Sequence, residues 1–509
     1  MNWIKANKWQ LVFLTGLVLI TYGWTLNHAF LSDDIYGIVN NPQIFDFSWV
    51  WQNPLIVLGR FIYFSIAKMW GIVPWPYRLL NIMAHLLTVI GVMELTARLI
   101  NRKVGLLAAS LAAVHPIMIE SVTWIAGGGH SIYGACLVWS LILYLKAEKK
   151  IKWLVISTVL FLAALQFSEK AAMFPGILLV YRLAVNRKRG RWLDLAPYIL
   201  LSLIWLILNV RGIGSRLNYL ETEYNSQNRE AKNSVFIQTP VAIGNYLGLM
   251  VWPDKLTLYH SELIVGKSKF IIMAGVSLIY FGLTAWWLWQ GFRGRKDLGL
   301  GGFLLAWLVI GLTPTLLPLG VAWIVAERYV YFGSLGIYIL VAWGLIKWSQ
   351  KPKHTEFAWT VIVLLVCLLW LRSVIRNSDW QDQDHLWLAA ERTSPSSQQN
   401  HNNLGDLYGR RGDFKLAEWH FKRAIELNSS YADAMHNLAN TYLQLNQPDE
   451  AIKWYQEALK NKPSLWQSHV QLGVIYYQLG QLDLAREELE KALQLQPENK
   501  QIKQMLEQM

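Results

Sequence analysis

Charged residues are scarce in this chain, and cysteines are scarcer still. Asp, Glu, Lys and Arg make up 16% of the 509 residues, whereas soluble chains carry about 25%. The two cysteines, Cys136 and Cys367, both lie inside apolar runs. Two such residues cannot build a disulfide framework or a zinc site. The sequence therefore excludes a disulfide-stapled scaffold and disfavours an ordinary soluble protein.

Apolar residues are abundant instead, and they are grouped. The chain is 54% hydrophobic with 27 Trp, and its mean hydropathy is +0.25. Runs of about 17–22 apolar residues are long enough to cross a hydrocarbon core of roughly 30 Å as helices. We predict an all-α, polytopic membrane domain of about eleven spans: 9–28, 76–98, 104–120, 130–146, 152–168, 171–185, 192–210, 269–290, 299–317, 329–347 and 357–374.

The basic surplus predicts the orientation of these spans. The net charge is +13, but residues 399–509 hold 12 Lys and Arg against 14 Asp and Glu. The surplus therefore lies in the apolar part, largely in short breaks such as Lys347 to Lys353. Breaks of this kind face the cytoplasm, whereas a nucleic-acid binder would concentrate them on a soluble face. We expect no nucleic-acid partner and a cytoplasmic N-terminus. With eleven spans, everything after Leu371 would be extracytoplasmic or lumenal.

Three apolar stretches are not predicted to span. Thr239 to Leu258 is broken by Trp252-Pro253-Asp254, and we interpret it as re-entrant or interfacial, which is tolerated where the backbone is buried in protein. The long first outer loop contains Phe45 to Trp51 and Gly59 to Trp70. Both are rich in aromatic residues, and such stretches favour helices that lie at the membrane interface.

The last hundred residues repeat with a period of 34. Pro463 and Pro497 close the second and third units. This spacing is typical of tetratricopeptide repeats, in which small residues let paired helices touch and large ones fill the space between them. We predict a membrane domain over 1–376, a linker over 377–400 and three repeats forming an α-solenoid over 401–509. The aligned residues are Leu404, Leu438 and Leu472; Tyr408, Tyr442 and Tyr476; Ala417, Ala451 and Ala485; Phe421, Tyr455 and Leu489; and Ala424, Ala458 and Ala492.

Two adjacent carboxylates, Asp33 and Asp34, follow the first predicted span. Because neighbouring carboxylates repel, one of them can have a raised pKa or share a cation. One of them could act as a general base, which must reach the hydroxyl of an acceptor. The alternative is a solvated turn in which an aspartate caps the next helix, and the two residues alone favour that alternative.

Other ionisable residues gather at the outer ends of the predicted spans. Polar residues in such places are costly and by default mark function. Arginine grips phosphate with a bidentate fork, while His and Glu can hold a divalent cation or protonate a leaving phosphate. The alternative for each residue is a helix end anchored among lipid headgroups. The candidates are His85, His115, Glu120, His130, Glu169, Lys170, Glu327, Arg328 and Tyr329.

Several of these residues belong to longer motifs. The segment from Leu111 to Tyr144 resembles the matching part of the transmembrane-and-tetratricopeptide-repeat O-mannosyltransferases and their bacterial relatives. The order of a many-span domain followed by repeats is also similar. In this chain, glycines 127–129 and His130 stand where the family usually has charged residues, and Ser168-Glu169-Lys170 replaces its Ser-Lys-Glu order. The other motifs that carry the resemblance are His115-Pro116, Glu120-Ser121-Val122, Trp124-Ile125, Asp33-Asp34 with Asn41-Pro42, and Glu327-Arg328-Tyr329 with Tyr331.

The resemblance implies a glycosyltransferase C-like fold and an inverting transfer of a sugar from a polyprenyl-phosphate carrier to a protein hydroxyl. It implies Asp33 as the first choice of base and Asp34 as the second. It also implies that Arg328, with Glu327 and Tyr329, binds the donor phosphate. The remaining candidates would line the site, and a divalent metal would have Asp34, Glu120 and His130 as candidate ligands. The repeats would hold the acceptor.

Two other classes of function stay open at this point. The chain could be a non-catalytic membrane scaffold whose repeats recruit envelope proteins. A transporter is less favoured, because the sequence shows no inverted repeat and no pair of broken helices in matching halves. The residues do not reveal the sugar, the length of the carrier or the acceptor.

Overall fold

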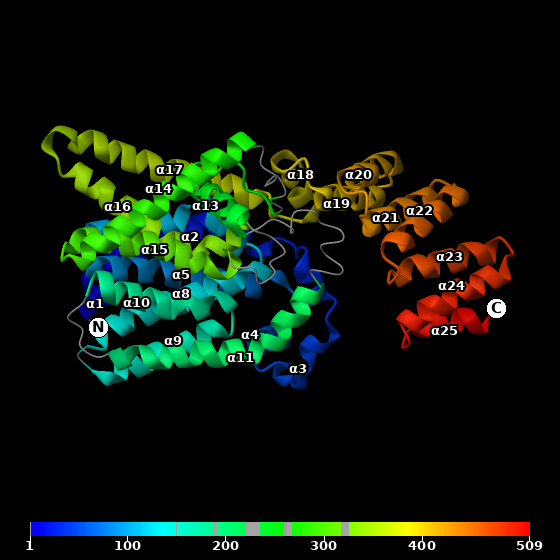
Figure 1. Cartoon of the computed structure of the whole chain (residues 1–509), viewed down its shortest axis with the longest axis horizontal. Coiled ribbons are helices and arrows are strands. Elements are labelled where there is room, and N and C mark those ends of the chain that lie inside the picture. Colours follow the sequence, from blue (N-terminus) through cyan, green and yellow to red (C-terminus); the bar gives the residue numbers. More distant parts are fainter. Residues whose placement is uncertain are drawn as a thin grey trace. The chain divides into compact units, whose positions relative to one another are not determined.

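The computed structural model describes residues 2–148, 150–186, 192–219, 235–258, 260, 267–316 and 325–509. Contacts divide the chain into two compact units: the first reaches from the N-terminus to Leu386, and the second is built on Trp387–Met509. Within the described ranges, every regular element is a helix (Figure 1). The all-α prediction is therefore confirmed.

The first unit is a bundle of long apolar helices. Short 3-10 or π helices also occur in it, and three of them position residues of the candidate site: η1 (Gly23–Asn27), η6 (Glu169–Met173) and η10 (Glu327–Val330). The α-helices are α1 (Asn2–Ala6), α2 (Lys8–Tyr22), α3 (Phe47–Trp51), α4 (Val57–Trp70), α5 (Pro74–Leu99), α6 (Arg102–Val114), α7 (Ile119–Val122), α8 (Gly129–Lys146), α9 (Ile151–Leu165), α10 (Phe174–Ala184), α11 (Ala196–Tyr219), α13 (Val235–Val251), α14 (Lys267–Phe292), α15 (Lys296–Leu316), α16 (Tyr331–Ser349) and α17 (Thr355–Ser378).

The many-span prediction is confirmed, and the count is close. Within the described residues, eight helices are long and apolar enough to cross a membrane, and the bent pair Arg102–Val114 with Pro116–Val122 makes a ninth. The other two predicted spans coincide with α9 and α10, which have 15 and 11 residues. At 1.5 Å per residue, both are shorter than a core of about 30 Å. The predicted interfacial stretches form α3 and α4.

The centre of this bundle is α5, which packs against α6 and α8, while α16 packs against both α6 and α15. Small residues allow the close approach. A Cβ at Gly105 would lie 2.6 Å from the carbonyl oxygen of Met93 on α5, so only glycine fits there. Asn101 begins α6 by accepting a hydrogen bond from the backbone N–H of Val104 at 3.0 Å, which satisfies one of the free donors of the first turn.

The break between α6 and α7 turns the chain by 58°. Pro116 has no N–H to continue the helical ladder. His115 caps the helical turn that follows, because its Nδ1 accepts a hydrogen bond from the backbone N–H of Ile117 at 3.2 Å. After the bend, the short helix α7, which carries Glu120, contacts η10 and α17.

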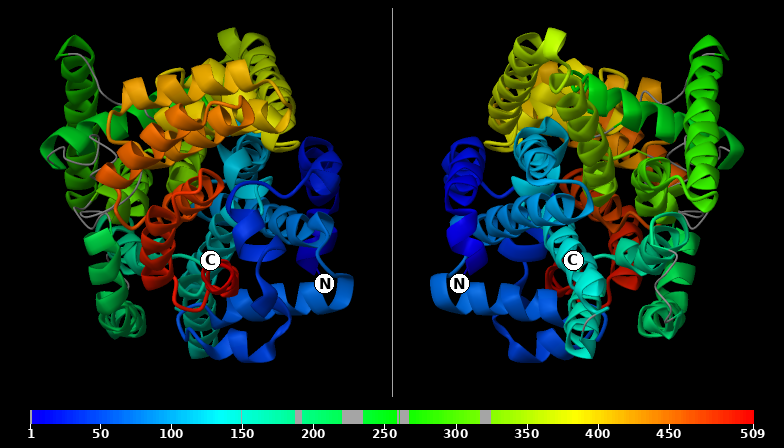
Figure 2. Two further views of the ribbon diagram at one scale, coloured as in Figure 1. Left: turned by 90° about the vertical axis from the view of Figure 1, so that its right-hand side faces the viewer. Right: turned by 90° about the vertical axis from the view of Figure 1, so that its left-hand side faces the viewer.

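The second unit confirms the repeats. Its helices form antiparallel pairs that stack in sequence order, as the labels α19 to α25 in Figure 1 and the orange to red helices in the left view of Figure 2 show. The residues that align at a period of 34 form its core, and the alanines among them are fully buried. The helices after α17 are α18 (Gln383–Thr393), α19 (Gln398–Arg410), α20 (Phe414–Leu427), α21 (Ala432–Gln444), α22 (Pro448–Asn461), α23 (Trp466–Gln478), α24 (Leu482–Leu495) and α25 (Lys500–Glu507).

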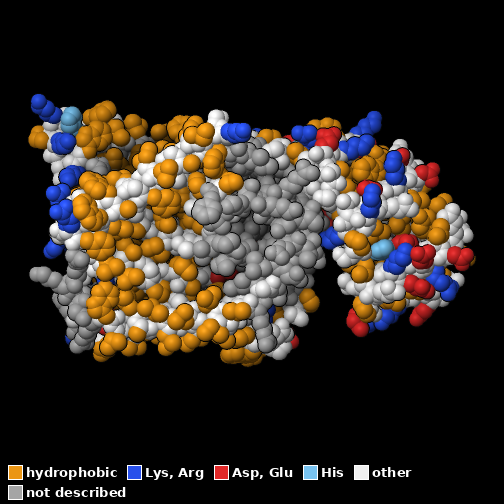
Figure 3. Space-filling model, in the orientation of Figure 1, with side chains coloured by type: hydrophobic (Ala, Val, Ile, Leu, Met, Phe, Trp, Pro, Cys, Tyr) orange, Lys and Arg blue, Asp and Glu red, His pale blue; other side chains and the backbone are white. Residues whose placement is uncertain are grey.

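The two units have different surfaces. In Figure 3, hydrophobic side chains cover the described part of the visible face of the first unit, whereas the repeats carry mixed charges of both signs. Exposed apolar side chains over α11, α14 and α17, such as Leu203, Ile271 and Leu368, are what a helix facing lipid requires. The first unit is therefore an integral membrane unit.

Candidate functional site

The loop after η1 is anchored by a buried arginine. Arg78 on α5 is 0% exposed, and its guanidinium donates to the carbonyls of His28 at 2.7 Å and Ala29 at 3.0 Å. It also donates to the carbonyls of Leu26 at 3.1 Å and Thr123 at 2.8 Å. A guanidinium carries five N–H donors in a fixed fork, so this one side chain ties the first loop to the chain beyond α7.

The two aspartates of this loop have opposite environments. Asp34 is 1% exposed, and its carboxylate accepts from the backbone N–H groups of Ala126 at 2.7 Å and Leu31 at 3.1 Å. Burial raises the pKa of Asp34 to about 7, although these two hydrogen bonds and nearby Arg78 act in the other direction. Asp33 is exposed. Asp34 therefore holds the loop in place, and Asp33 presents its carboxylate to the outside.

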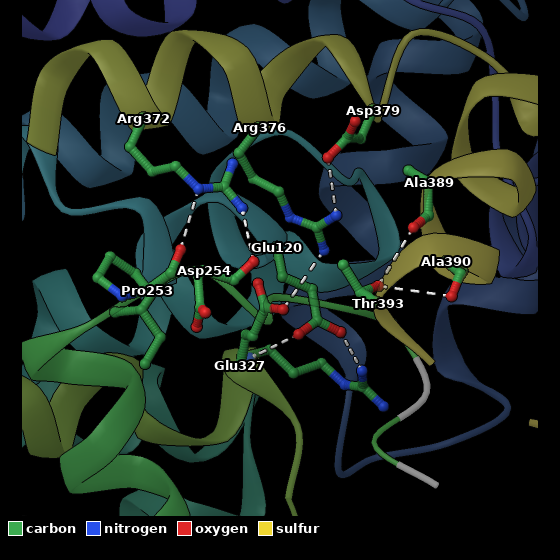
Figure 4. A network of polar contacts seen from close by, with 12 residues as sticks. Glu120, Pro253, Asp254, Glu327, Arg372, Arg376, Asp379, Ala389, Ala390 and Thr393 are labelled. Atoms are coloured by element: carbon green, nitrogen blue, oxygen red, sulfur yellow. Dashed lines mark hydrogen bonds and ion pairs between the residues drawn. The ribbon is translucent and has the colours of Figure 1, made fainter. Parts of the chain in front are cut away.

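Three ion pairs lie close together (Figure 4). Glu120 is buried, and one of its oxygens pairs with the guanidinium of Arg328 while the other accepts the backbone N–H of Arg328 at 2.8 Å. Next to it, Glu327 accepts from Arg376 on α17 at 3.3 Å, and Arg376 also pairs with Asp379 at 3.1 Å. All three carboxylates thus pair with an arginine, which the two buried ones, Glu120 and Glu327, require. The pairs fix η10 against α7 and α17.

Aromatic rings complete the surroundings of Arg328. Its guanidinium lies 5.3 Å from the ring centroid of Trp124 and 5.0 Å from that of Tyr329. The amine of Lys170 lies 3.9 Å from the centroid of the same tyrosine ring, and the ring of His130 is 6.1 Å from it. These cation–π distances are within the range of favourable contacts. Two cations therefore flank Tyr329.

Electrostatic interactions link the loop that carries Asp33 to the residues around Arg328. Asp33 lies within electrostatic reach of the Arg328 guanidinium, and His130 lies within reach of both Arg328 and Lys170. The side chain of Arg328 is 16% exposed, so part of it stays accessible after pairing with Glu120. An exposed carboxylate thus stands within electrostatic reach of a partly exposed cationic cluster. Glu169 precedes Lys170 on η6 and is half-buried.

Two predicted site-lining histidines have partners inside the bundle. The Nδ1 of His85 is 2.8 Å from the hydroxyl of Tyr331. The Nε2 of His115 is 3.0 Å from the carbonyl oxygen of Met250, while its Nδ1 caps the turn at Pro116. Both histidines are fully or almost fully buried. These are the contacts of packing residues, and neither histidine enters the mechanism proposed below.

Two arginines that organise the site were not identified from the sequence. Arg78 lies inside an apolar span, and Arg376 lies at the end of the last span. An arginine within an apolar run marks a special role by default, so Arg78 carried a signal that could have found it. The partners of Arg376, by contrast, come from elements far apart in the sequence.

The candidate metal ligands do not form a ligand set. Among the described residues, no group of three or more His, Cys, Asp or Glu side chains could hold a metal ion. The oxygens of Asp34 accept from backbone amides, and those of Glu120 bind Arg328. His130 lies beside two cations. These residues do not fit the proposed metal, and no step below is routed through one.

Comparisons with known proteins give three findings. Residues 56–211 match the family model described as dolichyl-phosphate-mannose-protein mannosyltransferase. Residues 396–464 and 466–499 match tetratricopeptide repeat models. The chain is 22% identical to the human protein O-mannosyl-transferase TMTC3 over 91% of its own length and 56% of that protein, and 24% identical to human TMTC1 over 84% and 56%. The chain thus spans little more than half the length of these relatives.

A solved structure is also similar. It is ArnT from Cupriavidus metallidurans bound to undecaprenyl phosphate, which covers 92% of this chain and 81% of its own at 15% identity, with a TM-score of 0.43.

Proposed function

Because this chain resembles the transmembrane-and-tetratricopeptide-repeat O-mannosyltransferases in its membrane unit and in its repeats, we propose that it is an inverting membrane glycosyltransferase. It transfers mannose or another hexose from a polyprenyl-phosphate carrier to a hydroxyl of a protein acceptor, on the outer face of the membrane. The observation that carries this proposal is the exposed Asp33, which stands within electrostatic reach of Arg328.

Asp33 is the base in this reaction. Its carboxylate takes the proton of the acceptor hydroxyl as that oxygen bonds to C1 of the sugar, on the face opposite the carrier phosphate. The bond between C1 and the phosphate oxygen breaks, and polyprenyl phosphate leaves with the electron pair. A general base must lie within hydrogen-bond reach of the proton it takes, and an exposed carboxylate meets that condition where the buried Asp34 does not.

The leaving phosphate gains charge as the bond breaks, and the cations around Tyr329 would stabilise it. Arg328 is held in place by Glu120, so little reorganisation is needed when the charge develops. Lys170 contributes a second positive charge from η6. Tyr329 separates the two cations, and Glu327 binds Arg376 and so anchors η10. Asp34 positions the loop that carries the base.

The polyprenyl-phosphate donor is proposed from the description of the matched family model, whose members use dolichyl-phosphate-mannose. The repeats are proposed to hold the protein acceptor. A scaffold without catalytic activity is the competing function, and it would need the repeats but not Asp33. Replacement of Asp33 therefore distinguishes the glycosyltransferase from the scaffold.

The test compares two aspartate variants of the same loop. Asp33→Asn keeps the shape of the side chain but cannot accept a proton, and we expect transfer of labelled mannose from polyprenyl phosphate to a peptide to fall about 10²–10⁴-fold. Asp46→Asn is the matched control, because Asp46 is also exposed and caps α3. Melting temperatures should be unchanged for both. Full transfer by Asp33→Asn would remove it as the base, and the absence of transfer in the wild type with every prenyl donor would favour the scaffold.

A further inference from the structure

An apolar groove lies on the membrane unit away from the site described above. It has a volume of about 550 Å³ and is formed by α2, α6, α16 and α17. Side chains that line it include Phe13 and Leu17 of α2, Leu107 of α6, Ile346 of α16 and Val363 of α17. The volume falls within the range of ligand-binding cavities, about 300–1,000 Å³.

The groove has a single cationic group in its lining. That group is the ammonium of Lys103. Among the described lining residues, Ser110 carries the one aliphatic hydroxyl. That hydroxyl donates to the carbonyl oxygen of Leu106 at 2.9 Å, so it is already satisfied. Lys103 is exposed and lies in the first turn of α6. The groove thus has an apolar body and a positive charge at one end.

The length of the groove matches one leaflet of a membrane. Its lining on α17 runs from Trp359 to Trp370, which is about 16 Å at 1.5 Å per residue. Half of a hydrocarbon core is roughly 15 Å. A single acyl chain that enters beside Lys103 would therefore reach the other end of the groove near the middle of the bilayer.

The charged end lies opposite the candidate site. Helix α6 begins beside Lys103, and the chain beyond its other end carries Glu120. Further cations adjoin the lining in sequence: Arg102 precedes Lys103, and Lys347 follows Ile346. Arg102 also lines a second cavity of about 270 Å³, in which Arg98 is compensated by its ion pair with Glu94 and Arg102 is the additional cation. Positive charge therefore accumulates at this end, as it does where membrane proteins bind anionic headgroups.

We propose that this groove binds one anionic phospholipid, with an acyl chain along α17 and the phosphate at Lys103. The apolar lining stabilises the chain through burial, and the ammonium attracts the headgroup while its aliphatic stem stays in the groove. The bound lipid would lie in the leaflet opposite the candidate site. The inference does not depend on glycosyl transfer, because no residue of the groove belongs to that site.

Native mass spectrometry of the full-length protein tests the proposal. Phosphatidylglycerol and phosphatidylcholine with the same acyl chains are titrated onto the delipidated protein. We expect the protein to bind one phosphatidylglycerol molecule tightly and to prefer it clearly over phosphatidylcholine. Lys103→Ala should weaken the binding of phosphatidylglycerol about fivefold and remove the preference over phosphatidylcholine, since one basic residue near an anionic lipid contributes about that factor in affinity. The control is Lys152→Ala, a cation at the start of α9, away from the groove.

A second variant tests the groove itself. Val363 is 56% exposed, so Val363→Trp fills the space without entering the core, and it should reduce binding of both lipids. The proposal is overturned if Lys103→Ala keeps the preference for phosphatidylglycerol, or if Val363→Trp still binds both lipids as the wild type does. Displacement of the lipid by an equimolar polyprenyl phosphate would also overturn it, because the groove would then belong to the donor.

Discussion

Glu120 binds Arg328 twice, once at its guanidinium and once at its backbone N–H. A single carboxylate therefore fixes both the main chain of η10 and the direction of the arginine side chain. Because the pair is held from the buried side, the guanidinium edge that stays exposed is presented in one orientation. The next prediction follows from that geometry.

Replacement of Arg328 should weaken binding of the donor. A hydrogen bond to a charged group is worth about 1.5–3 kcal/mol, so Arg328→Ala should bind polyprenyl-phosphate mannose roughly ten- to a hundredfold less tightly. Arg328→Lys should be intermediate, because an ammonium lacks the planar fork. The measurement is donor affinity by calorimetry. Arg372→Lys is the control, since Arg372 donates to the carbonyls of Pro253 and Asp254 (Figure 4). Unchanged affinity in Arg328→Ala would remove this residue from the donor site.

The stability of the membrane unit should fall as the pH rises from about 4 to about 7. The folded-state pKa of Asp34 is raised to about 7, above the value of about 3.9 in an unfolded chain. Its stabilising contribution is therefore complete below pH 4 and is lost as the pH rises through 7. The loss is on the order of a few kcal/mol, since one pKa unit is about 1.4 kcal/mol. Thermal melts across this range should show the slope in the wild type and a smaller one in Asp34→Asn; equal slopes would contradict the assignment.

Gly128 should not tolerate a methyl group. A Cβ at this position would collide with the side-chain amide of Asn81, whose nitrogen donates to the carbonyls of Trp124 and Ile125 at 3.2 and 3.4 Å. We expect Gly128→Ala to lower the stability by about 1–3 kcal/mol, the usual range for overpacking. Gly37→Ala is the control, because nothing lies within 4 Å of a Cβ there. Equal melting temperatures for the two variants would mean that Asn81 moves aside at no cost.

A similar pair of glycines tests the packing of the repeats. A Cβ at Gly405 would lie 2.6 Å from the ring of Phe421, whereas one at Gly409 on the same helix would meet only Ala417 at 3.9 Å. Gly409→Ala should be neutral or stabilising by about 0.5–1 kcal/mol, because alanine favours the helix. Gly405→Ala should lower the stability by roughly 1–2 kcal/mol, since overpacking exceeds that gain. Chemical denaturation of the full chain, monitored in the repeats, distinguishes them; the reverse order would refute the assigned contact.

Labelling of single cysteines should reveal which side of the membrane the repeats face. Lys415 is exposed and helical. In a variant without Cys136 and Cys367, Lys415→Cys should react with an impermeant reagent added from outside. Lys353→Cys, in the turn between α16 and α17, should react only after the membrane is opened. The opposite pattern would place the repeats in the cytoplasm and end the proposal of an outer-face site.

The elements that were predictable from the sequence are those with strong periodicity. Apolar runs gave the long helices, and the period of 34 gave the repeats, because each of these signals is local. The exceptions are the two short helices: α9 ends at Leu165, before the predicted end of its span, and α10 begins only at Phe174 because η6 occupies Glu169–Met173. Helix ends depend on capping and packing, which hydropathy does not record.

The sequence named several residues that the structure brings together, but it missed Arg78 and Arg376 and could not assign the contacts of any of them. Asp33 and Asp34 are adjacent and identical in type, and what separates them is Ala126, whose backbone N–H binds only one of them. His115 drew attention as a polar residue at a helix end, yet its partner is the carbonyl of Met250. Contacts between residues this far apart in the chain leave no trace in local composition. Residue type and position in the chain could therefore suggest candidates, but the contacts of each candidate come only from the fold.

The first loop of the membrane unit is joined to the last segment of that unit. The backbone N–H of Ala29 donates to the carbonyl of Gln381, and His28 contacts the carbonyl of Trp380, 352 positions away. Ribosomes add about 5–20 residues per second, so this partner emerges roughly 20–70 seconds after the loop does. During that interval of biosynthesis, the loop that carries Asp33 lacks its contacts with Trp380 and Gln381. A chain that stalls before Trp380 should insert its earlier spans and still lack a finished loop.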